Sequence, residues 1–234
     1  LAIGRLRLDA LLPCTVAAVV ADQVGLLWGV QHTPYAVGHV PHITVWLLAA
    51  MVVAGAVFGW AGKLFADGTH GLSSLMKKHI AYAPLRPLIG GAVIAAVVMW
   101  GDFDRYIGLG IPVMVEAFAH PLAPTDFLGK ALFTIASLGT GFKGGEVTPL
   151  FYIGATLGNA LAPVLQHPFA WLAALGLVGV FAGAANTPLA CTLMAIELFG
   201  AGMGVHALVA CVMSYLVSGH LGIYKAQKAP HRKH

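Results

Sequence analysis

A glycine-rich segment directly before an apolar run has the residue types and spacing to bind an ion. Residues 139–150 read Gly-Thr-Gly-Phe-Lys-Gly-Gly-Glu-Val-Thr-Pro-Leu. The glycines allow a tight turn, and Pro149 suits the first turn of a helix, where its missing N–H costs nothing. The free N–H groups of that turn and the positive end of the helix dipole attract small anions. The segment therefore predicts an anion site at a helix N-terminus.

Glu146 is the most costly residue of this segment, because a carboxylate inside a bilayer costs about 3 kcal/mol. An ionised carboxylate beside an anion would be repelled, so we expect Glu146 to take up a proton. The neutral acid could then donate a hydrogen bond to the anion, which would couple protons to anions. On spacing alone a second role is equally open, in which Glu146 caps the helix by accepting first-turn N–H bonds.

The sequence lacks the residue patterns that several other chemistries require. A phosphate loop ends in Gly-Lys-Ser/Thr, whereas Lys143 comes before the last glycine pair. Two His-x-x-His pairs, at 39–42 and 231–234, have no cysteine or carboxylate partners, and the three cysteines show no CxxC spacing, so we expect no metal and no cofactor. Neither a Ser/His/Asp nor an HExxH arrangement indicates an enzyme. The basic tail has no interleaved aromatic residues, so nucleic acid is not an expected partner.

The composition shows what surrounds the glycine-rich segment. Of the 234 residues 59% are apolar and only 9% are charged, and the mean hydropathy is +0.83. A soluble domain carries about a quarter charged residues, so this chain cannot cover its own surface in water. We expect an all-α polytopic membrane protein with roughly seven to ten helical passes or half-passes.

Short apolar runs separated by glycine and proline predict short, tilted and broken helices. Such segments indicate discontinuous helices whose ends reach membrane depth only where they line a binding site or an aqueous path. Residues 71–86 are expected to form an amphipathic, cytoplasm-facing connector. The expected apolar segments are Leu11–Leu27, Ile43–Phe65, Pro87–Trp100, Val113–Phe118, Phe127–Leu138, Val147–Leu165, Phe169–Ala184, Leu189–Phe199 and Met203–Val217.

Charge and chain ends predict the domain plan. We expect a transmembrane domain over residues 1–228 and a basic cytoplasmic tail over residues 229–234. Basic residues gather near both ends of the chain, and by the positive-inside rule they place the C-terminus in the cytoplasm. The chain opens at Leu1 without an initiator Met or a signal-peptide pattern, so we expect a fragment of a longer protein.

The segment from Gly141 to Pro149 resembles the signature that opens helix N of the CLC family of chloride channels and proton-coupled anion antiporters. Three further stretches agree in order and spacing. Residues 185–197 resemble helix P, residues 218–224 resemble the approach to the last helix with its central tyrosine, and residues 108–112 fall where helix L begins. The resemblance covers nearly the whole chain and corresponds to helices I to R, roughly the second of two inverted repeats. It implies an all-α CLC-type inverted-repeat fold.

The resemblance also implies roles for single residues. The backbone N–H groups of Glu146 and Val147 would point at the central anion, and Thr148 would lie beside them. The Tyr224 hydroxyl would donate to the anion from the cytoplasmic side, and Glu146 would couple protons. The implied anion site comprises Gly144, Gly145, Glu146, Val147, Thr148 and Tyr224.

The Glu-Val-Thr sequence at 146–148 departs from the usual family signature, which has two apolar residues and an alanine there. It resembles the branch of the family whose members exchange fluoride for protons. Fluoride is a strong hydrogen-bond acceptor and costly to dehydrate, so an extra carboxyl and hydroxyl at the site make chemical sense. The family's other anion-site motifs, including its gating glutamate, belong to helices D and F, which precede helix I. Residues 108–112 look like the helix D motif, but their place in the chain makes them the structural helix L counterpart.

The leading hypothesis is proton-coupled fluoride export by a homodimeric antiporter of the cytoplasmic membrane, of which this chain is a part. Its partners would be fluoride or chloride, protons, membrane lipid and a second copy, with helices I, P and Q resembling the family's dimer-interface elements. Two alternatives remain open. One is a chloride-selective channel or chloride/proton exchanger with the same fold, and the other is a truncated chain with no transport of its own.

Overall fold

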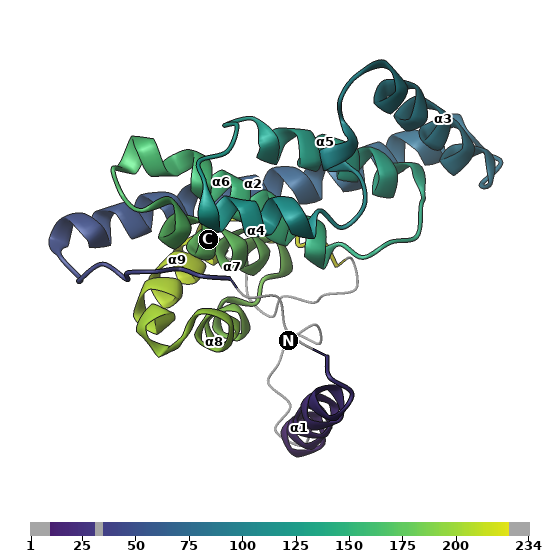
Figure 1. Cartoon of the computed structure of the whole chain (residues 1–234). Coiled ribbons are helices and arrows are strands. Elements are labelled where there is room, and N and C mark those ends of the chain that lie inside the picture. The colour runs from purple at the N-terminus through teal and green to yellow at the C-terminus, as the bar shows by residue number, and fades with distance from the viewer. Residues whose placement is uncertain (1–9, 31–34, 225–234) are drawn as a thin grey trace.

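The computed structural model describes residues 10–30 and 35–224, and in this part of the chain all regular structure is helical. Figure 1 shows the helices in chain order. They are α1 (Leu11–Leu27), α2 (Val45–His79), α3 (Leu85–Trp100), α4 (Ile111–Ala119), α5 (Asp126–Thr140), α6 (Val147–Leu165), α7 (Phe169–Ala185), α8 (Pro188–Phe199) and α9 (Gly204–Val217), with short 3₁₀ turns η2 (Asp104–Tyr106) and η3 (Ala201–Met203). The expected all-α fold class is confirmed. The expected tail, residues 229–234, lies outside the described residues.

Helix α2 corrects the expected boundaries. The sequence predicted an apolar helix ending at Phe65 and a connector over residues 71–86, but one continuous helix runs from Val45 to His79. A glycine within a helix costs only about 1 kcal/mol, so the glycines of this stretch weaken the helix without ending it. The Thr44 hydroxyl caps the start by accepting from the Leu47 amide at 3.2 Å, and basic residues occupy the last turn, where they suit the dipole.

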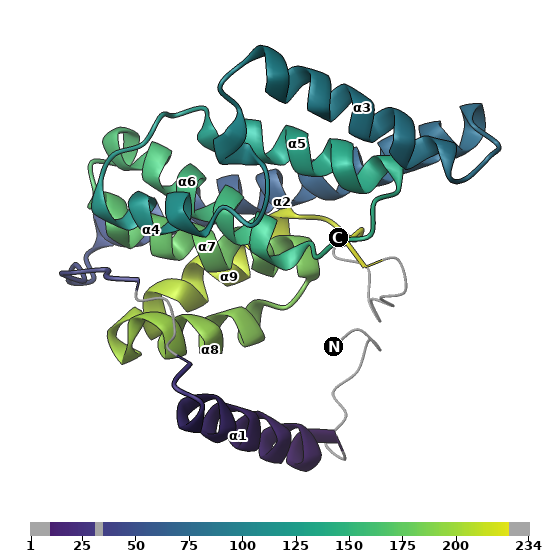
Figure 2. The same ribbon diagram turned by 45° about the vertical axis from the view of Figure 1, so that its right-hand side comes forward.

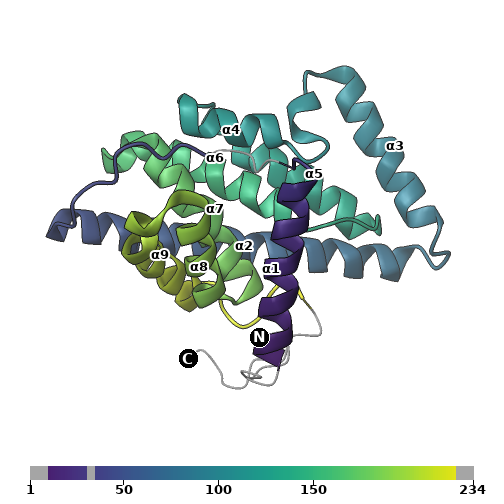
Figure 3. The ribbon, with the colours of Figure 1, turned by 60° about the horizontal axis from the view of Figure 1, so that its bottom comes forward.

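Helix α7 forms the centre of the molecule. Its residues are buried along nearly the whole helix, and it packs against α2, α4, α6, α8 and α9. Figure 2 shows α7 between α6 and α9. Figure 3 shows α3 at the periphery, beside α5. Of the described helices α2 and α6 are long and apolar enough to cross a membrane, and α1, α3, α7, α8 and the stretch Ala201–Val217 are shorter apolar helices.

Glycines allow the central helices to touch backbone to backbone. A Cβ added at Gly154 of α6 would overlap the carbonyl of Gly176 on α7, and one added at Gly59 of α2 would overlap the carbonyl of Ser214 on α9. Close approach of this kind is how helices associate in lipid, where hydrophobic burial gives no advantage. The glycines of α2 and α6 therefore let these helices pack closely against α9 and α7.

Asn159 ties α6 to the end of α4. Its side chain is 3% exposed and accepts from the Leu122 amide at 2.9 Å, while its amide donates to the carbonyls of Ala117 at 2.7 Å and His120 at 2.8 Å. The last carbonyls of a helix have no partner within the helix, and here one buried side chain supplies it. The bonds fix the short helix α4 against α6.

Replacing Asn159 with Leu is expected to lower the free energy of unfolding by about 3 kcal/mol, because it leaves three backbone groups, one of them in a fully buried hydrogen bond, without their partner. Thermal unfolding of the protein in detergent micelles measures the change. Gln23→Leu, which alters an exposed amide on α1, is the matched control and is expected to melt like the wild type. Equal unfolding temperatures for the two variants would show that the Asn159 bonds contribute nothing to stability.

Candidate functional site

The glycine-rich segment joins α5 to α6 where the sequence predicted a helix N-terminus. Helix α5 ends at Thr140, and Gly141 follows with a φ of +107°, a left-handed conformation that glycine adopts without strain. Helix α6 begins at Val147, and Pro149 lies in its first turn. The expected start of the helix is confirmed.

The first turn of α6 leaves its hydrogen-bond donors free. Within the described residues, the amides of Glu146, Val147 and Thr148 donate no hydrogen bond, and the Leu150 amide is the first to bond back, to the Glu146 carbonyl at 3.3 Å. Glu146 is the N-cap residue, but its side chain makes no capping bond. This geometry does not support the capping role. The free amides and the carboxyl group are all available to a ligand.

A cavity of about 630 Å³ collects most of the residues that the sequence assigned to the anion site. Glu146 and Val147 enter it from the start of α6, and Tyr224 enters it from the segment after α9. The predicted residue Thr148 does not line this cavity. The full lining is Thr69, His70, Ser73, Leu138, Phe142, Lys143, Gly144, Gly145, Glu146, Val147, Ile223 and Tyr224.

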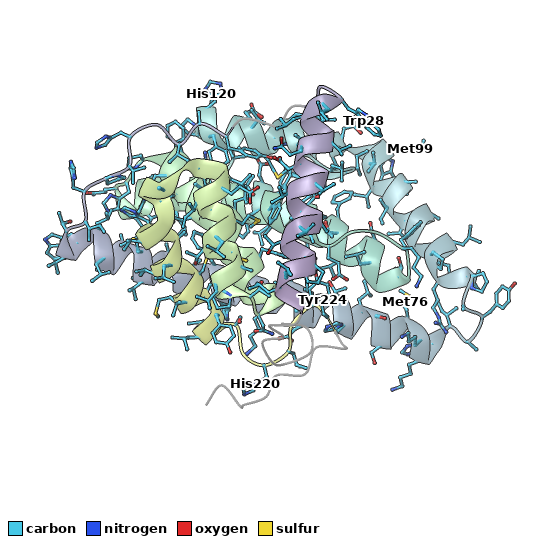
Figure 4. All side chains as sticks on the ribbon, turned by 90° about the horizontal axis from the view of Figure 1, so that it is seen from below. Trp28, Met76, Met99, His120, His220 and Tyr224 are labelled. Carbon is cyan, nitrogen blue, oxygen red and sulfur yellow. The ribbon has the colours of Figure 1, made fainter. Side chains whose placement is uncertain are left out.

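Backbone contacts hold the segment that carries Tyr224. The Ile223 amide donates to the Ala184 carbonyl of α7 at 2.9 Å, and the ring Nε2 of His70 donates to the Gly222 carbonyl at 3.1 Å. Figure 4 shows Tyr224 on the same side of the molecule as Met76, near the end of α2, and opposite Trp28, Met99 and His120. The cavity therefore lies toward the side at which α2 ends.

A second cavity, of about 530 Å³, lies against the same glycine-rich segment. Gly144 and Gly145 line both cavities, and the second is completed by residues of α3, α5 and the loop before α4, including Lys130 and Gly108. Pro149 lines only the second cavity. The glycine-rich segment thus borders both cavities. Gly144 and Gly145 contribute only backbone atoms to the two walls, because glycine has no side chain.

Lys130 and Asp126 of α5 are buried charged residues that the sequence analysis missed. Lys130 is 1% exposed, and its Nζ donates to the carbonyls of Tyr106 at 3.0 Å and Gly108 at 2.6 Å. Asp126 is fully buried, pairs with Arg105 at 2.9 Å and accepts from the Tyr106 hydroxyl at 3.0 Å. The sequence signal was Lys130 within the apolar run Phe127–Leu138, with Asp126 directly before that run. These bonds hold the loop before α4, which supports a structural role for residues 108–112.

Metal binding has no support in the part of the chain that the structure describes. No three or more of its His, Cys, Asp and Glu side chains lie close enough together to hold a metal ion. His39 and His42 are neighbours, with ring centroids 6.0 Å apart, but no third ligand joins them among the described residues. His231 and His234 lie outside the described residues.

The family follows from comparison with known proteins. A family model described as "Voltage gated chloride channel" matches residues 1–219. The chain belongs to the CLC family. It is accordingly a multi-pass membrane protein and not an enzyme, and the resemblance drawn from its motifs is confirmed.

Individual relatives agree with this CLC assignment. A "Chloride/fluoride channel protein" of Pseudomonas syringae pv. tomato is 60% identical over 241 residues, which is 100% of this chain and 53% of the relative. A "Voltage-gated ClC-type chloride channel ClcB" of Salmonella dublin is 29% identical over 97% of this chain and 58% of the relative. A solved structure, "Crystal structure of a CLC-type fluoride/proton antiporter", superimposes with a TM-score of 0.92 and 31% identity over 97% of this chain and 57% of its own. The chain spans about half the length of the relatives it matches.

Proposed function

We propose that this CLC chain carries the helix-N anion site of a proton-coupled fluoride antiporter. One observation carries the proposal: Glu146, which has a carboxyl group, and Tyr224, which has a hydroxyl group, line one cavity at the free N-terminus of α6. The names of the Pseudomonas relative and of the solved structure, both of which mention fluoride, support it. The Glu-Val-Thr sequence at 146–148 supports the same branch of the family.

The chemistry of the site suits a small, strongly hydrated anion. Dehydrating fluoride is costly unless other donors replace its water, and charge-assisted hydrogen bonds are the strong ones. The free amides of Glu146 and Val147 supply neutral donors, and the Tyr224 hydroxyl supplies a third from another part of the chain. Protonated Glu146 would add an O–H donor.

Proton binding and fluoride binding are linked through Glu146 in this scheme. When the carboxyl group is protonated it donates to the anion, and when it loses the proton its negative charge repels the anion. Each ligand therefore changes the affinity of the site for the other, so proton binding and anion binding are thermodynamically linked. The proton is held on a carboxyl oxygen of Glu146 and leaves through the cavity that this side chain lines.

Flux through proteoliposomes tests the substrate. For the full protein in which this chain occurs, we expect fluoride efflux to drive measurable proton movement and to be at least about tenfold faster than chloride efflux, which corresponds to about 1.4 kcal/mol of discrimination. A fluoride electrode, a chloride electrode and a pH electrode follow the three ions. Equal fluoride and chloride flux would overturn the fluoride assignment and favour the chloride channel or exchanger, which the name of the Salmonella relative supports.

The activity of the 234-residue chain by itself is a separate question, because its relatives are about twice as long. The resemblance assigns other anion-site motifs to the family's helices D and F. We therefore expect the chain alone to give no flux in liposomes. Flux by the chain alone would contradict this expectation.

Orientation and assembly are part of the same proposal. We place the protein in the cytoplasmic membrane with its C-terminus on the cytoplasmic side. The basic last turn of α2 supports this orientation, because it lies on the same side of the molecule as Tyr224 (Figure 4). We also propose a homodimer. Exposed apolar side chains on α8 and α9, among them Leu189, Leu193, Val205 and Leu208, support a role for these helices in the interface.

A further inference from the structure

His70 of α2 contacts the segment that carries Tyr224. Its half-buried ring donates from Nε2 to the Gly222 carbonyl at 3.1 Å, across 152 positions of sequence. A carbonyl can only accept, so the hydrogen of the neutral ring is assigned to Nε2. The Ile223 amide donates to the Ala184 carbonyl at 2.9 Å from the next position, so α2 and α7 hold the segment at adjacent residues directly before Tyr224. The bond to His70 therefore matters for where Tyr224 lies.

His70 also borders the cavity that contains the proposed anion site. The charged and titratable groups that line this cavity with it are Lys143 and Glu146, from the segment before α6, and Tyr224, from the segment after α9. The contribution of α5 is Leu138, and the other α2 residues of the lining are Thr69 and Ser73, none of which titrates in the physiological range. His70 therefore borders the same cavity as Glu146 and Tyr224, the two side chains proposed to bind the anion.

We propose that His70 positions the Tyr224 segment, and with it the Tyr224 hydroxyl, at the cavity that holds the anion. The Nε2–H group is the donor to the Gly222 carbonyl, so this role requires an N–H donor at position 70. Without that donor the segment loses its bond to α2. The inference rests on the proposed function, because the anion is the one that Glu146 and Tyr224 bind.

Two substitutions test whether the hydrogen bond positions the segment. Gln at position 70 keeps an N–H donor for the Gly222 carbonyl, whereas Leu has no donor. We expect His70→Gln to bind fluoride within about twofold of the wild type. We expect His70→Leu to bind about tenfold more weakly, because Tyr224 is no longer held.

The measurement is calorimetric titration of fluoride into the full protein in detergent micelles. His79→Gln, which changes an exposed histidine of the same helix that does not line the cavity, is the matched control and is expected to bind fluoride as the wild type does. Hydrogen exchange at residues 219–224 gives a second reading of the positioning role. Exchange should be faster in His70→Leu than in His70→Gln, and His70→Ala replaces the Leu variant if that variant does not fold.

Two outcomes overturn the positioning role. If His70→Gln binds as weakly as His70→Leu, the N–H donor is not what His70 provides. If His70→Leu or His70→Ala binds and exchanges like the wild type, His70 does not position the segment. A wild-type protein that binds chloride but not fluoride overturns the proposed substrate instead, and the same titrations with chloride then test His70.

Discussion

Replacing Glu146 with Gln is expected to abolish proton-coupled fluoride transport while leaving the protein folded. Gln has nearly the same shape as Glu, so the start of α6 and the cavity walls stay in place. It cannot release or bind a proton at physiological pH, so anion binding is no longer linked to proton binding. Removing a group that transfers protons typically lowers a rate by a factor of about 100 or more, and we expect a loss of that size in coupled flux.

The measurement is fluoride-driven proton movement in proteoliposomes, with size-exclusion chromatography to confirm that the variant remains folded. Glu116→Gln is the matched control, since Glu116 is an exposed acid of α4 whose contact with Arg105 is 4.0 Å long. A surface pair of this kind contributes little, so its loss should leave coupled flux unchanged. Wild-type coupling in Glu146→Gln would reduce Glu146 to a structural residue.

Gly158→Ala is expected to destabilise the protein by about 3 kcal/mol, through a clash at the contact between α6 and α7. A Cβ at this position would overlap the carbonyl oxygen of Leu172, and it would lie 2.6 Å from the carbonyl carbon and 2.9 Å from the Cα of Ala173. These atoms belong to the backbone of the buried central helix and cannot move aside as a side chain can. The two helices would have to separate along their shared face.

Thermal unfolding in detergent micelles measures this loss. Gly71→Ala is the control, because it makes the same chemical change within α2 at a position with no atom within 4 Å of the new Cβ. Alanine is the better helix former by about 1 kcal/mol, so the control should be neutral or slightly more stable. Equal destabilisation by both changes would show that backbone contact between α6 and α7 is not what the glycine provides.

Part of the anion site could be predicted from local sequence. The glycines at 144 and 145, the acid at 146 and the proline at 149 are neighbours in the chain, and together they indicate a helix N-terminus with a costly carboxylate. Tyr224 entered only through resemblance to a family, because nothing near position 224 points to position 146. The structure places both in one cavity.

His70 and Lys130 could not be assigned from local patterns. His70 is one of eleven histidines in the chain, and the sequence placed it between an expected helix and an expected connector. Its contact with Gly222 depends on where the segment after α9 passes α2. Lys130 could have been singled out as a charge in an apolar run, but its acceptors, the carbonyls of Tyr106 and Gly108, lie more than twenty positions away. Helix α2 was underestimated because the apolar run ends at Phe65, whereas the helix continues to His79. Its later part packs against α5, with Gly68 facing Ile135 and Leu72 facing Gly139.

The sequence by itself determined that the chain lies in a membrane, that it is helical and where most of its helices lie. It also determined that a helix starts near Val147 with free amides. These follow from composition and from interactions within a few residues, which local sequence encodes. The tertiary structure alone decided which distant segments meet: α6 with α7 through glycines, Asn159 with the end of α4, and Glu146 with Tyr224 and His70 around one cavity. Those contacts depend on how whole helices cross, and helix crossing is fixed by packing over the full length of each helix rather than by any short motif.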